Sequence, residues 1–242
     1  MRALIISDIH ANRTALQAVL SAAGPVDQVW CLGDIVGYGP DPNECIDILR
    51  NLPHLVSILG NHDAAVCDQI PHEVFNPEAR HAIQWTHLSL TQSNLDWLCH
   101  LPEQTEVEGV TLAHGSPRNP VWEYLLDPNT AGLNFGYFSG DLCFVGHTHL
   151  PILYQKIAHQ RSARWLIPAD NQAVVLSGRF IINPGSVGQP RDRDPRASYG
   201  LYETDTRTWL PMRVPYNIQE VQDRIIAAHL PERHAVRLSD GW

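Results

Sequence analysis

The sequence predicts an α/β fold, in which strands and helices alternate along the chain. The first sixty of its 242 residues hold three short apolar runs, as expected of strands covered on both faces, separated by two segments of helical periodicity. Further apolar runs return after residue 110, and another helical pattern follows near the end. Because two successive β-α-β units build a parallel sheet with right-handed crossovers, the chain begins as an α/β domain.

The first elements follow one another in the order β-α-β-α-β. The strands are expected at residues 3–6, 29–32 and 55–59. The first helix places apolar residues at positions 16, 19, 20 and 23 and ends at Gly24-Pro25. The second helix begins after Asp41 as its N-cap, with Pro42 at its first position, and carries its apolar stripe to Leu52.

The middle and end of the chain show a different pattern. Residues 68–100 indicate two or three helices rather than strands. Apolar runs typical of strands return at residues 110–113 and 142–145, around Ile152, and at 165–167, 173–176, 180–182 and 199–203. A helix is expected over 218–228, whereas the tail after Pro231 has no clear period. The sequence shows neither an internal repeat nor a linker. We therefore expect one domain over 1–242, with a helical insertion at about 68–102 and a loop-rich insertion at about 115–141.

The composition narrows the class of protein. Apolar residues make up 44% and charged residues 18%, which is typical of a folded globular chain. A net charge of −9 argues against binding duplex nucleic acid through a broad basic surface, and so against sequence-specific nucleic-acid recognition. No apolar run approaches the roughly 20 residues of a membrane span, and we expect no secretory leader before the first strand. The five cysteines form no close pair, so we expect reduced, buried thiols and a cytoplasmic location.

Polar side chains directly follow five of the expected strands. The clusters are Asp8-Ile9-His10, Gly33-Asp34, Gly60-Asn61-His62-Asp63, His114 and Gly146-His147-Thr148-His149. Since ligands bind at the carboxyl ends of parallel strands, we expect these clusters to meet at one edge. Taken singly, each has an ordinary structural explanation, as a helix cap, a turn residue or a surface histidine. Taken together, the five clusters favour a ligand-binding site.

The composition of this set indicates a metal centre. It holds two carboxylates, one carboxamide and four imidazoles, which suit Mn, Fe, Zn or Ni better than Ca or Mg, with Mn favoured. The absence of cysteine argues against a structural zinc site. Seven ligands exceed the needs of one ion, so they predict two divalent ions about 3.5–4 Å apart that share a carboxylate.

The same ordered series resembles the calcineurin-like metallophosphoesterases, over residues 3 to about 204. The segments Gly33-Asp34-Ile35-Val36-Gly37-Tyr38-Gly39-Pro40 and Asn183-Pro184-Gly185-Ser186-Val187-Gly188 look like the small bacterial phosphodiesterase and phosphatase branch. Protein Ser/Thr phosphatases carry an Asp-Arg-Gly after the second aspartate, where this chain has Gly37-Tyr38-Gly39. The resemblance implies a four-layer α/β/β/α sandwich of two mixed sheets flanked by helices.

The resemblance also implies residue roles. Asp8, His10 and His149 would hold one ion; Asn61, His114 and His147 would hold the other; and Asp34 would bridge them. His62 would act as a general acid or stabilise the phosphoryl group, and Asp63 would orient His62. The reaction would be in-line attack of a metal-bridging hydroxide on a small phosphodiester or phosphomonoester, with the two ions attracting phosphate to an acidic chain.

Other assignments stay open at this point. Tyr38, Arg118, Arg191, Arg193 and Arg196 are candidates for substrate binding, with exposed loop arginines as the plain alternative. A dinucleoside polyphosphate (diadenosine tetraphosphate) hydrolase or a nucleotide phosphatase would use the same ions, although such hydrolases have a basic residue where this chain has Tyr38. A catalytically silent scaffold that binds a phosphate ligand is the alternative outside enzymes. A metal-dependent peptidase or amidase lacks support, because no His-Glu-x-x-His is present. A homo-oligomer is compatible with the sequence.

Overall fold

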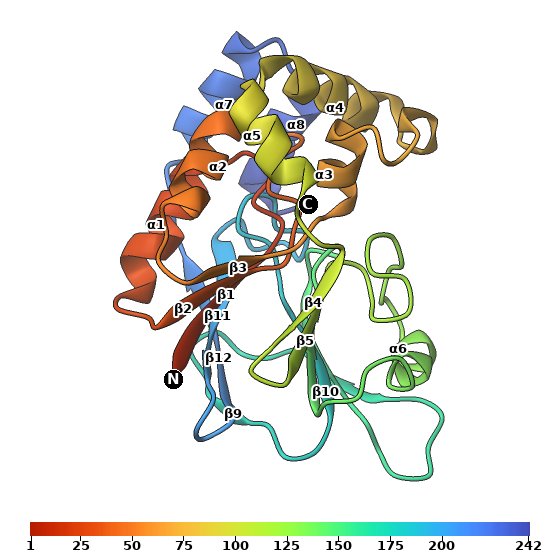
Figure 1. Cartoon of the computed structure of the whole chain (residues 1–242). Helices are drawn as coiled ribbons and strands as arrows, with labels where there is room; N and C mark the ends of the chain where they lie inside the picture. Colours follow the sequence, from red (N-terminus) through yellow and green to blue (C-terminus); the bar gives the residue numbers. More distant parts are fainter.

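Two mixed six-stranded sheets pack face to face in the computed structural model, which describes all residues 1–242 (Figure 1). The first sheet has the strand order β3-β2-β1-β11-β12-β9 and the second β4-β5-β6-β10-β7-β8. The first sheet is built from β1 (Arg2–Ile6), β2 (Gln28–Cys31), β3 (Leu55–Ser57), β9 (Val174–Val175), β11 (Ala197–Glu203) and β12 (Thr208–Val214). The second is built from β4 (Gln104–Val107), β5 (Val110–Ala113), β6 (Leu142–Phe144), β7 (Pro151–Gln155), β8 (Arg164–Leu166) and β10 (Phe180–Pro184).

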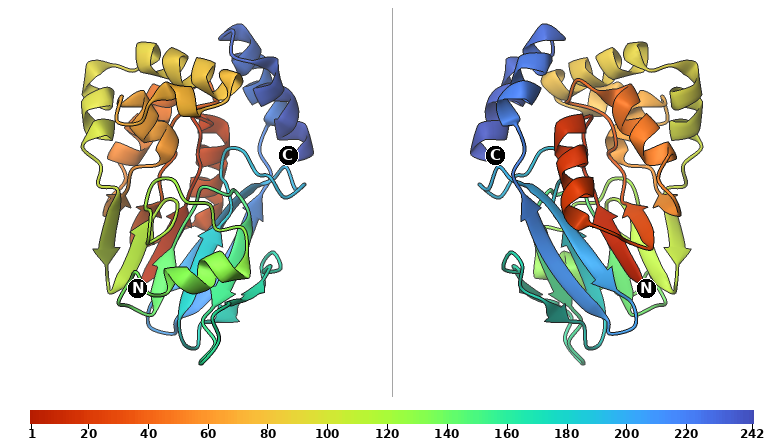
Figure 2. Two further views of the ribbon diagram at one scale, coloured as in Figure 1. Left: turned by 90° about the vertical axis from the view of Figure 1, so that its right-hand side faces the viewer. Right: turned by 90° about the vertical axis from the view of Figure 1, so that its left-hand side faces the viewer.

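The helices gather beyond one end of the sheets and along their outer faces (Figure 2). They are α1 (Arg13–Ala23), α2 (Pro42–Arg50), α3 (Asn61–Val66), the 3₁₀ turn η1 (His72–Val74), α4 (Pro77–Ser89), α5 (Gln92–Cys99), α6 (Pro128–Asn134), α7 (Ile218–Ala227) and α8 (Glu232–Asp240). Helix α6 lies apart from the others, against the second sheet (Figure 1).

Strand β1 shows how the sequence builds the layers. Its side chains alternate between two cores, with Ala3 and Ile5 between the sheets and Leu4 and Ile6 against the outer helices. A third cluster packs α6 on the outer face of the second sheet, through residues such as Phe135. Both faces of both sheets are therefore covered, and the predicted four-layer sandwich is confirmed.

Most of the predicted elements are present, and β1, β2 and β3 pair in parallel as expected. The prediction for the tail was wrong, because residues 232–240 form α8. The buried face of that helix consists of His234, Ala235 and Leu238, which is too weakly apolar to show a period. Strands β4 and β12 and the short helices α3 and α6 were also missed; β12 contains a proline and β4 is largely exposed.

The cysteine prediction needs a correction. Cys67 and Cys99 form a disulfide that joins the end of α3 to the end of α5, whereas Cys31, Cys45 and Cys143 are free and buried as expected. The two bonded residues are 32 positions apart, and only the packing of two helices brings them together. The disulfide removes one reason for expecting a cytoplasmic location, which stays a prediction. None of the helices has the length and apolar character needed to cross a membrane.

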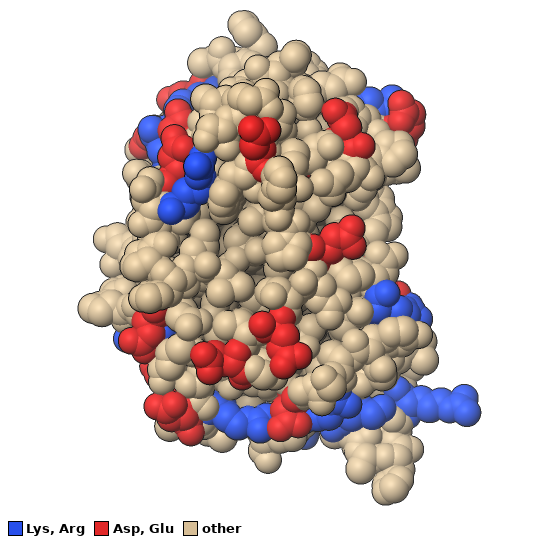
Figure 3. All heavy atoms as spheres, viewed as in Figure 1, with Lys and Arg blue, Asp and Glu red and all other residues tan.

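The surface agrees with the charge of the sequence. Figure 3 shows Lys and Arg mixed with Asp and Glu around the margin of one face, with a band of basic side chains only along its lower edge. The broad middle of that face carries few charges. This face therefore lacks the continuous basic surface typical of proteins that bind duplex nucleic acid.

Candidate metal centre

The seven predicted ligands converge at the carboxyl ends of strands from both sheets. Asp8 and His10 follow β1, Asp34 follows β2, and Asn61 opens α3 after β3. From the second sheet, His114 follows β5, and two histidines follow β6. All seven side chains are at most 3% exposed. Packing the two sheets face to face is what joins these clusters, since neither sheet holds the whole set.

The ligands fall into two groups that share Asp34. One group contains Asp8, His10, Asp34 and His149, and the other contains Asp34, His114 and His147. Within each group, one donor atom per residue lies within 4.8 Å of all the others. The side chain of Asn61 adds to the second group, because its Oδ1 lies 3.2 Å from His114 Nε2.

The hydrogen bonds of the first group leave lone pairs facing one another. His10 Nδ1 donates to the carbonyl of Val36 at 3.1 Å, and His149 Nδ1 donates to the carbonyl of Gln189 at 2.6 Å. Each neutral imidazole has one proton, so both Nε2 atoms carry lone pairs, and they lie 3.1 Å apart. A carboxylate oxygen of Asp8 is 3.3 Å from the second of them. A cation between these acceptors would satisfy them all.

The second group has the same arrangement. His114 Nδ1 donates to the carbonyl of Leu32 at 2.8 Å, so its Nε2 faces the oxygens of Asn61 and Asp34, the latter at 3.4 Å, where a proton or a metal ion can bind. His147 Nε2 is buried without any partner. The mixed oxygen and nitrogen donors fit a divalent transition metal.

The backbone around the ligands is strained. Five of the seven residues have positive φ: Asp8 (54°), His10 (48°), Asp34 (51°), His147 (66°) and His149 (61°). Side-chain-bearing residues rarely adopt this left-handed region, at a cost of about 1–2 kcal/mol each. Such strain clusters at functional sites, where the surrounding structure holds the side chains in place.

Burial and mutual repulsion shift the pKa values of the ionisable ligands. Burial raises the pKa of Asp8 to about 7 and lowers those of His10, His147 and His149 well below their usual range. Burial alone would lower the pKa of His114, but the neighbouring carboxylate of Asp34 has the larger effect and raises that pKa to about 9. His10, His147 and His149 are therefore neutral, as metal binding requires, whereas His114 would release its proton when a metal ion binds.

His62 lies beside this group, packed by aromatic rings. Its ring centroid is 4.3 Å from that of Tyr38, 5.2 Å from that of Phe75 and 5.1 Å from that of His10. Burial lowers the pKa of His62 to about 4. Its Nδ1 is buried without a partner against Gly37, so Nε2 is the ring nitrogen left to meet a ligand.

The role expected for Asp63 needs correction. Its carboxylate does not bond to His62; it accepts hydrogen bonds from the backbone N–H groups of Gly60 (3.0 Å), Ile35 (3.2 Å) and Val36 (3.0 Å). Asp63 therefore ties the loop after β2 to the start of α3, and so fixes Asp34 relative to Asn61. Aromatic packing, rather than a carboxylate, orients His62.

The loop at residues 183–189, which includes the segment that resembles the family, also supports the ligands. Asn183 Nδ2 donates to the carbonyl of Gly146 at 2.6 Å, and Ser186 Oγ donates to the carbonyl of Asp8 at 2.8 Å. The carbonyl of Gln189 holds His149, as described above. This loop thereby links the segments after β1 and β6.

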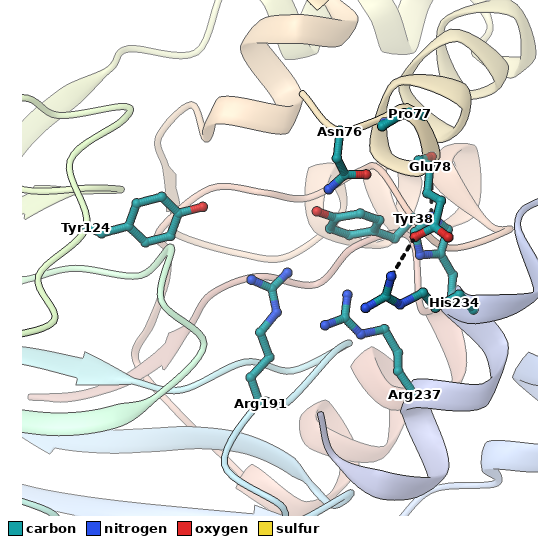
Figure 4. Close-up of a pocket in the computed structure, with 9 residues that line it drawn as sticks. Tyr38, Asn76, Pro77, Glu78, Tyr124, Arg191, His234 and Arg237 are labelled. Atoms are coloured by element: carbon teal, nitrogen blue, oxygen red, sulfur yellow. Dashed lines mark hydrogen bonds and ion pairs between the residues drawn. The ribbon is translucent and has the colours of Figure 1, made fainter. Parts of the chain in front are cut away.

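Of the predicted substrate-binding residues, only Tyr38 and Arg191 line the cavity beside the metal ligands (Figure 4). Arg118 pairs with Glu123, and Arg196 pairs with Asp194 and Asp170. The guanidinium of Arg193 lies 5.4 Å from the ring centroid of Trp242. None of these three arginines lines the cavity.

Both predicted insertions reach this cavity. Asn76, Pro77 and Glu78 line it from the start of α4, within the 68–102 segment. Tyr124, from the 115–141 segment, lines it too and stacks on His147 with ring centroids 3.7 Å apart. Both insertions therefore contribute side chains to the cavity beside the metal ligands.

Gly60 provides a test of the ligand geometry. A Cβ at this position would collide with the backbone and carboxylate of Asp34. Gly60→Ala should therefore displace that carboxylate and weaken metal binding about 10- to 100-fold, as measured by titration of the metal-stripped protein. Gly136→Ala is the matched control, because its new Cβ meets only the carbonyl of Leu133, at 3.5 Å. Equal metal affinity in the two variants would contradict the prediction.

The chain is similar in sequence and in structure to known proteins. The family model described as "Calcineurin-like phosphoesterase superfamily domain" matches residues 1–207. The chain is 37% identical to an uncharacterised protein, MJ0912, of Methanocaldococcus jannaschii, over 97% of this chain and 96% of the other. It is 26% identical to phosphodiesterase YfcE of Escherichia coli, over 85% and 89%. The crystal structure of a metallophosphoesterase from Sphaerobacter thermophilus superimposes with a TM-score of 0.92 at 47% identity, covering 100% and 99%.

Proposed function

We propose that this chain, which belongs to the calcineurin-like phosphoesterase superfamily, hydrolyses small phosphodiesters or phosphomonoesters with two divalent metal ions. As a family member, the chain is a phosphoric ester hydrolase. The observation that carries the proposal is the sharing of Asp34 by two buried ligand groups whose imidazole lone pairs converge.

The ligands divide between the two ions by their positions. Asp8, His10 and His149 would hold one ion, and Asn61, His114 and His147 the other, with Asp34 between them. When bound, the two ions neutralise phosphate charge and lower the pKa of the attacking water. Because the ligand side chains are buried and held by backbone hydrogen bonds, the chain presents a preorganised site to the phosphoryl group.

His62 is the protein group we place in contact with substrate. With its pKa lowered by burial, the ring is neutral near pH 7 and can donate a single N–H, from Nε2. That hydrogen bond can go to the leaving oxygen or to a phosphoryl oxygen. Tyr38 and Phe75 pack against the ring and fix its orientation.

The proposal is tested by removing and restoring metal. Chelation should abolish hydrolysis of bis(p-nitrophenyl) phosphate and p-nitrophenyl phosphate, and Mn, Fe or Zn added singly should restore it better than Mg. Elemental analysis of the restored enzyme should give two ions per chain. A single ion at full activity would refute the two-ion arrangement, and preferred turnover of diadenosine tetraphosphate would favour the polyphosphate hydrolase. No turnover of any ester by a fully loaded protein would support a silent scaffold.

A further inference from the structure

The cavity beside the metal ligands is lined partly by the C-terminal helix. It has a volume of about 520 Å³, within the range of small-molecule sites. Tyr38 and Tyr124 line it next to the metal ligands, while Arg233, His234 and Arg237 reach it from α8 (Figure 4). This helix lies beyond residues 1–207, which the family model matches. The part of the cavity that α8 lines therefore lies outside the residues that the family model matches.

Two arginines in this cavity have no aspartate or glutamate partner. Figure 4 shows Arg191 and Arg237 directing their guanidinium groups into the same space, and neither lies within ion-pair distance of an aspartate or glutamate. Arg233, by contrast, pairs with Glu78 at 3.6 Å. Three arginines and one glutamate leave the lining with an excess of two positive charges.

The polar atoms of these residues are incompletely satisfied. Arg191 donates to the side chain of Gln189 at 2.9 Å, but its Nε is buried without a partner, as is Nδ1 of His234. Arg237 donates from Nε to the main-chain oxygen of Trp242, and its two terminal nitrogens make no hydrogen bond within the chain. Burial, followed by repulsion from Arg191, lowers the pKa of Arg237 to about 10. Like charges that face each other in a partly buried cavity are stabilised by an anion.

The ring of Tyr38 contacts both this positive region and the metal ligands. It packs on His10 and His62, with centroid distances of 4.7 and 4.3 Å. It also lies 4.8 Å from the ring of His234, and the guanidinium carbon of Arg191 is 5.9 Å from its centroid. An anion between the arginines would therefore lie close to the metal centre, although no metal ligand lines this cavity.

We propose that Arg191 and Arg237 form a subsite for a second phosphate group, so that the preferred substrates are small phosphate esters bearing another phosphate on a remote hydroxyl. This inference rests on the proposed function and names its substrate class. Guanidinium groups bind phosphate oxygens in bidentate fashion, and two of them approaching together suit a dianion. Because none of the metal ligands lines the cavity that the two arginines face, the phosphates are joined through a spacer such as a sugar rather than through a shared anhydride oxygen.

The test compares matched probes on the purified full-length chain. Calorimetry measures the binding of fructose 1,6-bisphosphate, fructose 6-phosphate, 6-phosphogluconate and adenosine 5′-diphosphate, and phosphate release is followed in parallel. The bisphosphate should bind about 10- to 100-fold more tightly than the monophosphate. Arg237→Gln should remove that preference and leave hydrolysis of bis(p-nitrophenyl) phosphate unchanged. Arg233→Gln, on the same helix, is the matched control and should keep the preference.

The outcomes separate the subsite from the proposed function. No preference for the bisphosphate, or equal loss for all probes in Arg237→Gln, overturns the subsite even if diesters are hydrolysed. Tighter binding of 6-phosphogluconate identifies a carboxylate site instead, and tighter binding of adenosine 5′-diphosphate overturns the remote spacing. A bisphosphate preference that depends on Arg237 without hydrolysis of any ester supports the subsite while the proposed function fails. Thermal unfolding of each variant shows whether the fold is intact.

Discussion

Asp34→Asn is expected to lower kcat/KM for bis(p-nitrophenyl) phosphate by roughly a thousandfold and to reduce the bound metal from two ions per chain to one or none. Asp34 is the one carboxylate that belongs to both ligand groups, and it also accepts a hydrogen bond from the backbone N–H of His62 at 2.9 Å. A neutral amide loses the charge that both ions share. Metal ions supply several kcal/mol of transition-state stabilisation, and each 1.36 kcal/mol is a factor of ten in rate.

The matched control for this variant is Asp141→Asn. Asp141 is an exposed aspartate that pairs with Arg207 at the surface, so the same change of charge should leave metal content and activity within about twofold of the parent. Both variants are compared by elemental analysis and by steady-state kinetics. If Asp34→Asn retained two ions and parental activity, the shared-carboxylate arrangement would be wrong.

His62→Asn is expected to lower kcat by about 10²- to 10⁴-fold while the chain keeps two metal ions. The ring contacts a metal ligand but belongs to neither ligand group, so its loss removes a hydrogen-bond donor rather than an ion. His81→Asn, at an exposed position in α4, makes the same substitution away from the cavity and should behave like the parent. Loss of metal in His62→Asn would show that the residue supports the ligands instead.

The leaving group distinguishes the two roles open to His62. If Nε2 donates to the leaving oxygen, His62→Asn should slow esters of poorly acidic alcohols more than esters of p-nitrophenol, whose anion leaves without a proton. If it donates only to a phosphoryl oxygen, both kinds of ester should slow by the same factor. Kinetics with a series of phenyl and alkyl phosphodiesters therefore assigns the role.

The order of the polar clusters allowed the candidate site to be predicted from sequence. Asp8, Asp34 and Asn61 each follow an apolar run, and strand periodicity is a local property of a few neighbouring residues. Parallel strands bring their carboxyl ends to one edge, so adjacency of these residues could be inferred without coordinates. His62 was recognised in the same way, but its aromatic neighbour Phe75 was not, since it comes from a separate segment.

Helix α8 illustrates the opposite case. Leu238 is the one large apolar side chain among its three buried residues, so no apolar stripe marks the helix. Its contribution of Arg237 to the cavity depends on packing across the whole chain. The pairing of Cys67 with Cys99 likewise follows from the packing of α3 against α5, which no spacing in the sequence reports.

By itself, the sequence determined the α/β class, the sandwich implied by family resemblance, and which residue types could bind metal. Those properties depend on local periodicity and on the order of motifs along the chain. The tertiary structure decided which atoms face each other: the opposed Nε2 atoms of His10 and His149, the backbone contacts of Asp63, and the guanidinium groups of Arg191 and Arg237, which point into one cavity. These facts depend on the directions of side chains from distant segments, which are set only when the two sheets and the outer helices pack together.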